Sequence, residues 1–254
     1  MELIALGIKP AVDLPDVGQH LTDHPIMAND WLVNSNQTVD DLRRSPSLAA
    51  AALAQWEHNK TGVYTTTLSH GVAFLRLPDA SPAFLDTPDP AAGPRSAHFE
   101  MLVRNGFSAN DVAAMPPTGH YISVQTAVVS PTSRGSVRLA SADPFASPVI
   151  DPNFFSTRFD QLVMLAAVRA ARAFVASPPW EGLVRRPVGA LADAESDEQI
   201  IAAARDSILT IWHPVSTARM SPRNASWGVV DSRLLVKGAS GLRVVDASVF
   251  VSYK

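Results

Sequence analysis

The chain has 254 residues, 46% of them hydrophobic and 18% charged, a composition that supports a folded core and excludes a wholly disordered chain. The formal net charge of −3, without a long run of Lys or Arg, argues against a nucleic-acid-binding protein. No stretch approaches about 18 uninterrupted apolar residues, so we expect no membrane span. The absence of cysteine excludes disulfides, thiolate metal sites and a cysteine nucleophile.

The first half of the chain predicts one helix followed by several strands. Residues 45–60 are alanine-rich, with leucines and a tryptophan at the spacing of a helix face. Runs rich in β-branched or aromatic residues and bounded by turn residues then predict strands at 70–77, 97–104, 120–130 and 135–142. The turn-rich string at 130–135 is typical of a hairpin connecting the last two strands.

The second half of the chain predicts two further helices. Residues 157–176 have the clearest helical pattern: Thr157 and Asp160 are spaced as in a capping box, and two prolines follow the last turn. Residues 196–209 place two acidic side chains in the first turn, which favours a helix. Strands grouped between helices, without regular alternation, predict an α+β fold in which helices flank an antiparallel sheet.

His213 is a candidate general base. Pro214 biases it away from helical torsions, so its ring is expected on a rigid loop just after a helix. The ordinary pKa of an imidazole lies near working pH, which suits proton transfer. A structural histidine bonded to the backbone fits the local sequence as well, and both interpretations stay open at this point.

Asp246 is a candidate ligand-binding carboxylate. It ends a segment at 241–246 that predicts a buried strand, and the small residues Ala247 and Ser248 would let a ribose or phosphate chain approach the backbone. The alternative is an Asp that caps the following turn. His20 and His24 stand four residues apart, but the surrounding prolines and glycine disfavour a helix and no third ligand is evident, so we predict no metal site.

The glycine positions exclude one common cofactor motif. The chain has 13 glycines, and no two of them are separated by a single residue, so there is no G-x-G-x-x-G string. The usual loop for gripping a dinucleotide pyrophosphate is therefore missing from these 254 residues.

Three strings together resemble the glucose–methanol–choline (GMC) oxidoreductases, a family of FAD-dependent enzymes that oxidise alcohols. Their order and spacing match family motifs: VDLPDVGQHLTDHP at 12–25, WHPVSTARM at 212–220 and GLRVVDASVF at 241–250. Within the family, three more strings are most similar to fungal aryl-alcohol oxidases, at 33–38, 89–98 and 220–231. The resemblance runs from about residue 3 to 250 and corresponds to roughly the C-terminal two fifths of a usual member.

The resemblance implies a division of the chain into three parts. Residues 1–30 would be a fragment of an FAD-binding domain, residues 31–205 a substrate-binding domain with the antiparallel sheet, and residues 206–254 a truncated C-terminal fragment of the FAD-binding domain. His20 stands where the family usually has Asn, and Ser216 where it usually has Gly. The family's second catalytic residue, His or Asn, is expected about a dozen residues beyond Phe250, so we expect the isolated chain to be inactive.

The resemblance also implies roles for single residues. His213 would be the catalytic base that takes the hydroxyl proton of a primary aryl or allylic alcohol while hydride passes to FAD. Phe107 and Trp212 would line the passage of this small-molecule substrate, and Asp246, Ala247 and Trp212 would contact the cofactor. Two alternatives remain: a non-catalytic remnant of the substrate domain serving as an interaction module, and a cyanohydrin lyase on the same scaffold.

The location of the protein is also implied by the family. The first ten residues lack the basic start and the long apolar run of a signal peptide. Three N-x-S/T sequons, at Asn36, Asn59 and Asn224, would permit glycosylation of a secreted protein. Together with the family resemblance they predict an extracellular protein, and nothing in the sequence fixes its oligomeric state.

Overall fold

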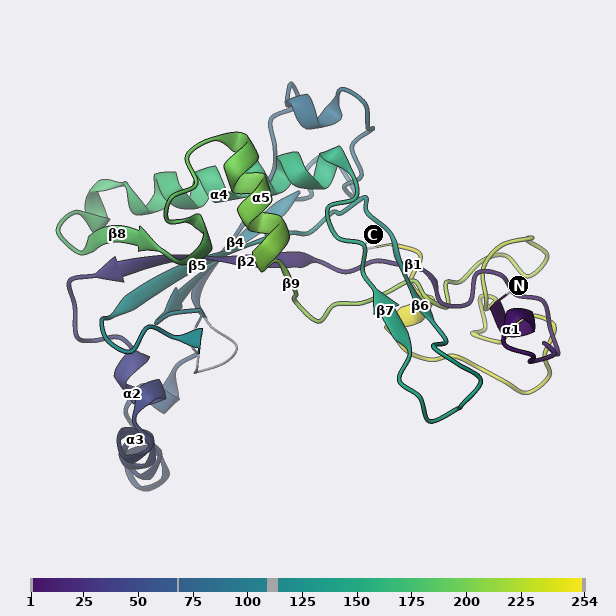
Figure 1. The fold of residues 1–254 in the computed structure, drawn as a ribbon, viewed down its shortest axis with the longest axis horizontal. Coiled ribbons are helices and arrows are strands. Elements are labelled where there is room, and N and C mark those ends of the chain that lie inside the picture. Colours follow the sequence, from purple (N-terminus) through teal and green to yellow (C-terminus); the bar gives the residue numbers. More distant parts are fainter. Residues whose placement is uncertain (1, 68, 109–113, 253–254) are drawn as a thin grey trace.

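The computed structural model describes residues 2–67, 69–108 and 114–252. A sheet with helices on one face forms one half of the molecule, and an extended region with little regular structure forms the other (Figure 1). The N-terminal and C-terminal ends of the described chain both lie in this extended region (Figure 1). No helix among the described residues is long and apolar enough to cross a membrane.

The main sheet is antiparallel, as the sequence predicts, with the strand order β3-β4-β5-β2-β8 and with β9 pairing the start of β2. Its strands are β2 Pro25–Val33, β3 Ser69–Leu75, β4 Phe99–Asn105, β5 Tyr121–Val128, β8 Val184–Val188 and β9 Leu209–Thr210. The predicted strands at 70–77, 97–104 and 120–130 correspond to β3, β4 and β5. The central strand β2 was not predicted, and it runs across the expected boundary at residues 30 and 31.

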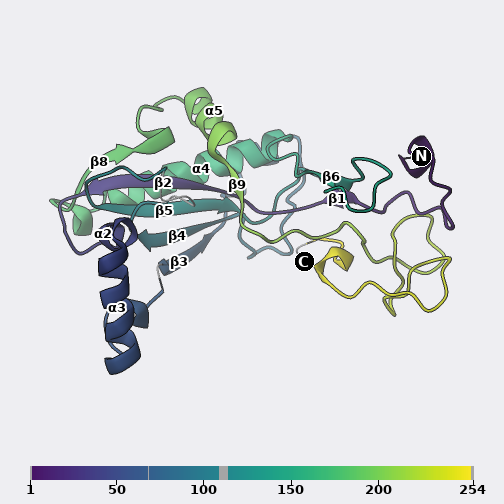
Figure 2. The same ribbon diagram turned by 60° about the horizontal axis from the view of Figure 1, so that its bottom comes forward.

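Two helices cover one face of this sheet (Figure 2). They are α4 Arg158–Val175 and α5 Asp197–Ser207, which confirms two of the three predicted helices. Alternate strand residues such as Met27, Phe99 and Val124 point toward α4 and join its buried side chains in the main apolar core. The opposite face of β2, β4 and β5 therefore carries the other alternate side chains, among them Glu100.

The N-termini of α4 and α5 are capped differently. The hydroxyl of Thr157 accepts the N–H of Asp160 as expected for an N-cap, but the Asp160 carboxylate does not return the bond. It accepts the backbone N–H groups of Thr132 at 2.8 Å and Ser133 at 3.0 Å. The complete capping box is at α5, where Ser196 and Gln199 bond reciprocally.

The predicted hairpin between the strands at 120–130 and 135–142 is wrong. After Pro131 the Asp160 carboxylate holds the next two backbone N–H groups, and the chain leaves the main sheet. Strand β6 Gly135–Arg138 instead joins β1 Gln19–Leu21 and β7 Val149–Asp151 in a separate three-stranded sheet. Gly135 permits the close approach of β7, since a Cβ there would lie 2.0 Å from the Asp151 carbonyl oxygen.

The third predicted helix is also present, but it buries nothing. Residues 45–60 form α3 Pro46–Asn59, which follows the short α2 Asp40–Arg44 and projects from the end of the sheet (Figures 1 and 2). Its apolar side chains Leu48, Leu53 and Trp56 are 39% to 49% exposed. The pattern predicted the helix correctly, while the packing expected of such a face is absent.

The extended region is made of the N-terminal helix α1 Glu2–Ala5, the small sheet and the C-terminal segment (Figure 1). The Asp16 carboxylate joins these parts, because it accepts from the Arg219 guanidinium at 2.8 Å and from the Gly228 backbone N–H at 2.5 Å. The buried strand expected within 241–250 is not present. Leu242 and Val245 are exposed, and this segment has an isolated bridge between Leu235 and Arg243 in place of the expected strand.

Candidate active site

His213 lies on the loop after β9, and its ring meets that of His24 at the start of β2. The two Nδ1 atoms are 3.2 Å apart, and the rings meet edge to face with centroids 5.3 Å apart. One carboxylate fixes both residues: Asp23 accepts the backbone N–H of His24 at 2.7 Å and that of His213 at 3.0 Å. The Thr210 hydroxyl donates to the other Asp23 oxygen.

The electrostatics of this pair favour a neutral His24. The pKa of His24 is lowered to about 4, mainly by burial and also by the positive charge of His213, while the charge of the neighbouring Asp23 acts in the opposite direction. Of two facing Nδ1 atoms only one carries a proton when both rings are neutral. With that proton on His213, the His213 Nδ1–H donates to the Nδ1 of His24.

Sequence reasoning identified His213 but missed Asp23 and His24. The available signal was the Asp-His-Pro string at 23–25, which belongs to the first of the three family-like motifs. His24 was considered only as one member of a metal pair with His20. In the structure His20 turns away and lies 3.4 Å from the Asp16 carboxylate, so the two histidines are not brought together at a shared ligand site.

The backbone around His213 adopts left-handed torsions on both sides. Trp212 has φ of 61° and Ser216 has φ of 79°, a region that residues other than Gly, Asn and Asp visit at a cost. Ser216 is 1% exposed, and its hydroxyl has no hydrogen-bond partner among the described residues. Glycine at position 216, as is usual in the family motif, would relieve both problems. His20, where the family usually has Asn, also has a positive φ of 62°.

A hollow of about 600 Å³ opens beside this loop. It brings together three of the residues predicted from the sequence, Trp212, Asp246 and Ala247, and the indole of Trp212 is 72% exposed. The Asp23 side chain reaches the same hollow, so its carboxylate connects the histidine pair with this space. Other residues of the wall are apolar or small: Leu21, Val137, Ile150, Pro152, Thr210, Pro214, Thr217 and Ser248.

Asp246 caps the turn that forms one wall of the hollow. Its carboxylate accepts the Ser248 backbone N–H at 2.8 Å, and this bonding lowers the pKa of Asp246. The capping role and a position on the hollow therefore coexist, and the two interpretations of this residue do not exclude each other. The small side chains of Ala247 and Ser248 leave this wall open to a large planar or sugar-like group, so the residues present fit one side of a flavin-binding site.

Phe107 lies apart from the other predicted residues. It lines a second hollow, of about 180 Å³, on the face of the sheet away from α4, together with Asp30 and Leu209. Its ring packs edge-on against Tyr121 with centroids 5.3 Å apart, and its backbone N–H donates to Asp40 at 2.8 Å. Strand β9 contributes a residue to each hollow, since Leu209 lines the smaller one and Thr210 the larger.

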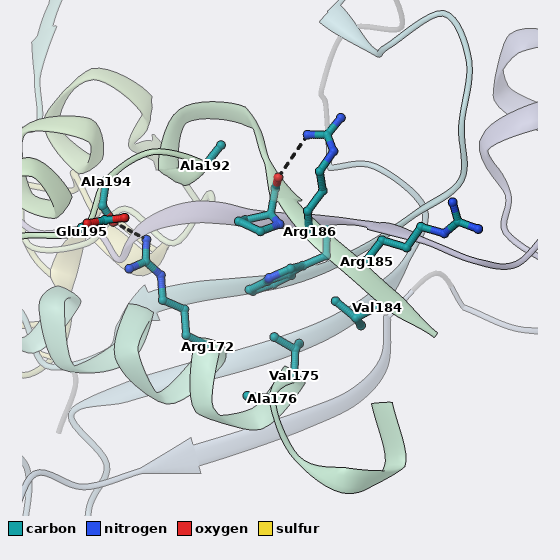
Figure 3. A pocket seen from close by; sticks show the side chains of 11 residues that line it. Arg172, Val175, Ala176, Val184, Arg185, Arg186, Ala192, Ala194 and Glu195 are labelled. Atoms are coloured by element: carbon teal, nitrogen blue, oxygen red, sulfur yellow. Dashed lines mark hydrogen bonds between the residues drawn. The ribbon is translucent and has the colours of Figure 1, made fainter. Parts of the chain in front are cut away.

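A third hollow, of about 360 Å³, contains none of the predicted site residues. It lies between α4 and β8, and the side chains of Arg172, Arg185 and Arg186 surround it (Figure 3). Arg172 donates to the carbonyl oxygens of Leu191 and Ala194, which ties the loop before α5 to α4. These two bonds explain the half-buried Arg172 structurally, without a ligand.

Comparisons with known proteins agree with this geometry. Residues 131–253 match the family model described as GMC oxidoreductase, in its C-terminal form. The chain is 37% identical over 262 residues to a pyranose dehydrogenase of Agaricus xanthodermus, covering 98% of this chain and 41% of that protein. Residues 131–253 belong to the C-terminal domain of the GMC oxidoreductases. The family resemblance found in the sequence is thereby confirmed.

Solved structures of GMC oxidoreductases also share the fold. An Aspergillus oryzae formate oxidase, studied for modification of its FAD, matches with a TM-score of 0.84 and 31% identity. The match covers 98% of this chain and 45% of the formate oxidase chain. A fungal aryl-alcohol oxidase matches with a TM-score of 0.72 and 27% identity, and the match covers 98% of this chain and 46% of the oxidase chain. The chain spans about two fifths of the length of the curated relatives it matches.

Proposed function

We propose that this GMC chain is the catalytic-base-bearing portion of an FAD-dependent enzyme that oxidises primary aryl or allylic alcohols to aldehydes. The observation that carries the proposal is the His213–His24 pair, held by Asp23 at the edge of the hollow that contains Trp212 and Asp246. Relatives that are a pyranose dehydrogenase and an aryl-alcohol oxidase are consistent with alcohol substrates.

In the proposed reaction His213 handles the proton. Its Nε2 accepts the proton of the substrate hydroxyl while His24 accepts the His213 Nδ1–H, and Asp23 holds the backbone of both residues in register. FAD, when bound, supplies the acceptor for the hydride that leaves the carbinol carbon. The exposed Trp212 indole provides a flat apolar surface on which an aromatic or allylic group can stack.

The residues proposed to hold FAD are Asp246, Ala247 and Trp212, on the walls of the larger hollow. They account for one side of the cofactor, because these 254 residues contain no G-x-G-x-x-G loop. We therefore propose that the isolated chain does not turn over alcohol. After incubation with FAD and desalting, a colourless protein is the expected result, and a retained flavin band would show that the chain binds the cofactor by itself.

The proton-transfer role is tested by His213→Ala in the complete FAD-containing enzyme of which this chain is the proposed portion. A general base contributes about 10²–10⁴ in rate, so kcat/KM for benzyl alcohol should fall by that factor while FAD absorbance is retained. His58→Ala, in the exposed part of α3, is the matched control. Unchanged turnover in His213→Ala would refute the proposed role, and release of cyanide from mandelonitrile would favour a lyase instead.

We also propose that the protein is secreted. The asparagines of all three sequons, Asn36, Asn59 and Asn224, are exposed in the structure, so each is accessible to glycosylation. Mass spectrometry of the protein from its native source, before and after removal of N-glycans, tests this. An unglycosylated protein found inside the cell would contradict it.

A further inference from the structure

The face of the main sheet away from α4 carries a row of side chains close to His213. The pairing register aligns Phe74 of β3, Glu100 of β4, Ala127 of β5, Ile26 of β2 and Leu209 of β9. Paired residues on neighbouring strands point to the same face of a sheet. Phe99 and Met101, on either side of Glu100, belong to the core under α4, so the row faces the opposite way. Glu100 is its single polar side chain.

Glu100 differs from the other buried carboxylates of this protein. It is only 7% exposed, yet no hydrogen bond or ion pair joins its carboxylate to any residue in the described part of the chain. Asp40 and Asp160 are both fully buried, and each accepts three hydrogen bonds. The donors to Asp40 are Thr38, Phe107 and Tyr121. The donors to Asp160 are the backbone N–H and the hydroxyl of Thr132 and the backbone N–H of Ser133. Those two carboxylates have structural roles, whereas the carboxylate oxygens of Glu100 remain available as hydrogen-bond acceptors.

The side chain of Glu100 faces the same space as His213. Burial raises the pKa of Glu100, and the positive charge of His213 is the influence that lowers it, which requires the two groups to be near each other. The register supports this, because Leu209 closes the row, and His24, two residues before Ile26 and in phase with it, meets the His213 ring with the two Nδ1 atoms 3.2 Å apart. A substrate whose hydroxyl meets His213 would therefore extend over this row.

We propose that Glu100 determines substrate specificity by accepting a hydrogen bond from a second donor of the substrate, separate from the hydroxyl group that His213 deprotonates. The substrate class is then an alcohol with a further hydroxyl or amino group, and a wholly apolar aryl alcohol fits less well. This inference rests on the proposed function of the His213 site. The neighbours of Glu100 in the row are apolar, so an unpaired donor or acceptor here is costly and discrimination is strong.

Equilibrium binding to the purified, flavin-free chain tests the inference without any turnover. The probes are 3-hydroxybenzyl alcohol, 3-aminobenzyl alcohol and 3-methylbenzyl alcohol, which have nearly the same shape and differ in the second donor. Ligand-observed NMR titration should give about 10-fold to 100-fold tighter binding of the probes with a donor. Equal affinity for all three probes, or binding of none, overturns the proposal, and this result needs no variant.

Variants assign the preference to Glu100 itself. Glu100→Gln should reduce the ratio of affinities and Glu100→Leu should abolish it, while Glu57→Gln on the exposed α3 should leave it unchanged. Folding of each variant is checked by circular dichroism, and a ratio that survives in a folded Glu100→Leu chain overturns the proposal. His213→Ala separates the two hypotheses, because it should slow oxidation in the complete FAD-containing enzyme and leave the ratio of affinities of the flavin-free chain intact.

Discussion

The Nδ1 atoms of His24 and His213 lie 3.2 Å apart although 189 residues separate the two histidines in the sequence. The pair forms because β9 joins the start of β2, which places the loop after β9 beside the residues that precede the strand. Asp23 then fixes the backbone of both histidines. The contact gives His213 a neutral neighbour at its Nδ1 atom.

The buried His24 should make the protein less stable in acid. Its pKa is about 4 in the folded protein and about 6.5 when unfolded, so the unfolded state binds the extra proton. The stability is fully present above pH 6.5 and is lost as the pH falls toward 4. The free energy of unfolding should drop by about 2 kcal/mol between pH 7 and pH 4.5 through this group. Urea unfolding at both values measures it.

The control for this pH dependence is a pair of variants. His24→Gln should reduce the loss of stability between pH 7 and pH 4.5 by about 2 kcal/mol, because the titrating group is gone. His58→Gln in the exposed helix α3 should leave the loss as it is in the unmodified chain. An equal loss of stability in His24→Gln and in the unmodified chain would contradict the assignment.

Ser216→Gly should stabilise the protein. The substitution relieves the left-handed backbone torsion of Ser216 and removes its buried hydroxyl, which has no partner among the described residues; both effects stabilise the fold. The greater conformational freedom of glycine in the unfolded chain partly offsets this gain. We expect a net gain of about 1 kcal/mol in the free energy of unfolding. Denaturant titration provides the measurement, and Ser226→Gly, at an exposed position, should lose a few tenths. A loss in both variants would show that position 216 is not strained.

The helices α4 and α5 could be predicted because their signals are local. Thr157 and Ser196 lie at the starts of the helices they cap, and both caps bond within three residues. The sheet depended on longer contacts. Strand β2 was missed since Asn29 and Asp30 look unfavourable in a buried strand. In the fold the Asn29 side chain donates to the Val124 carbonyl and the Thr126 hydroxyl, which makes its burial acceptable.

In the candidate site too, residues within local motifs could be predicted and residues that depend on strand pairing could not. The family resemblance placed His213, Trp212 and Asp246 through motifs that can be seen in short strings, and the structure brings Trp212 and Asp246 to one hollow. The first motif contains His24 without indicating its role, and none of the quoted strings contains Glu100, because both roles depend on which residues lie across the sheet from them. Strand pairing brings together residues that are distant in the chain, and no single string contains that information.

Asp160 should be among the side chains whose loss is most costly outside the site. Its carboxylate replaces the missing sheet partners of the Thr132 and Ser133 N–H groups at the point where the chain leaves β5. Asp160→Ala would leave both groups buried and unpaired, so the free energy of unfolding should fall by about 3 kcal/mol. Thr157→Ala, which removes the N-cap of the same helix and a hydroxyl contact with Thr132 but leaves both N–H groups paired, should cost about 1 kcal/mol. Equal losses in a urea titration would argue against this bridging role.

The C-terminal segment should make the isolated chain associate with itself. Its large apolar side chains are unusually exposed: Trp212 by 72%, Val245 by 70%, Phe250 by 57% and Leu242 by 55%. Apolar surface of this kind is removed from water by any available contact, so light scattering should show oligomers that grow with protein concentration. Val245→Lys together with Phe250→Lys should shift the chain toward a monomer, whereas Val72→Lys in β3 should not. Monomers at all concentrations in the unmodified chain would show that the exposed side chains do not drive association.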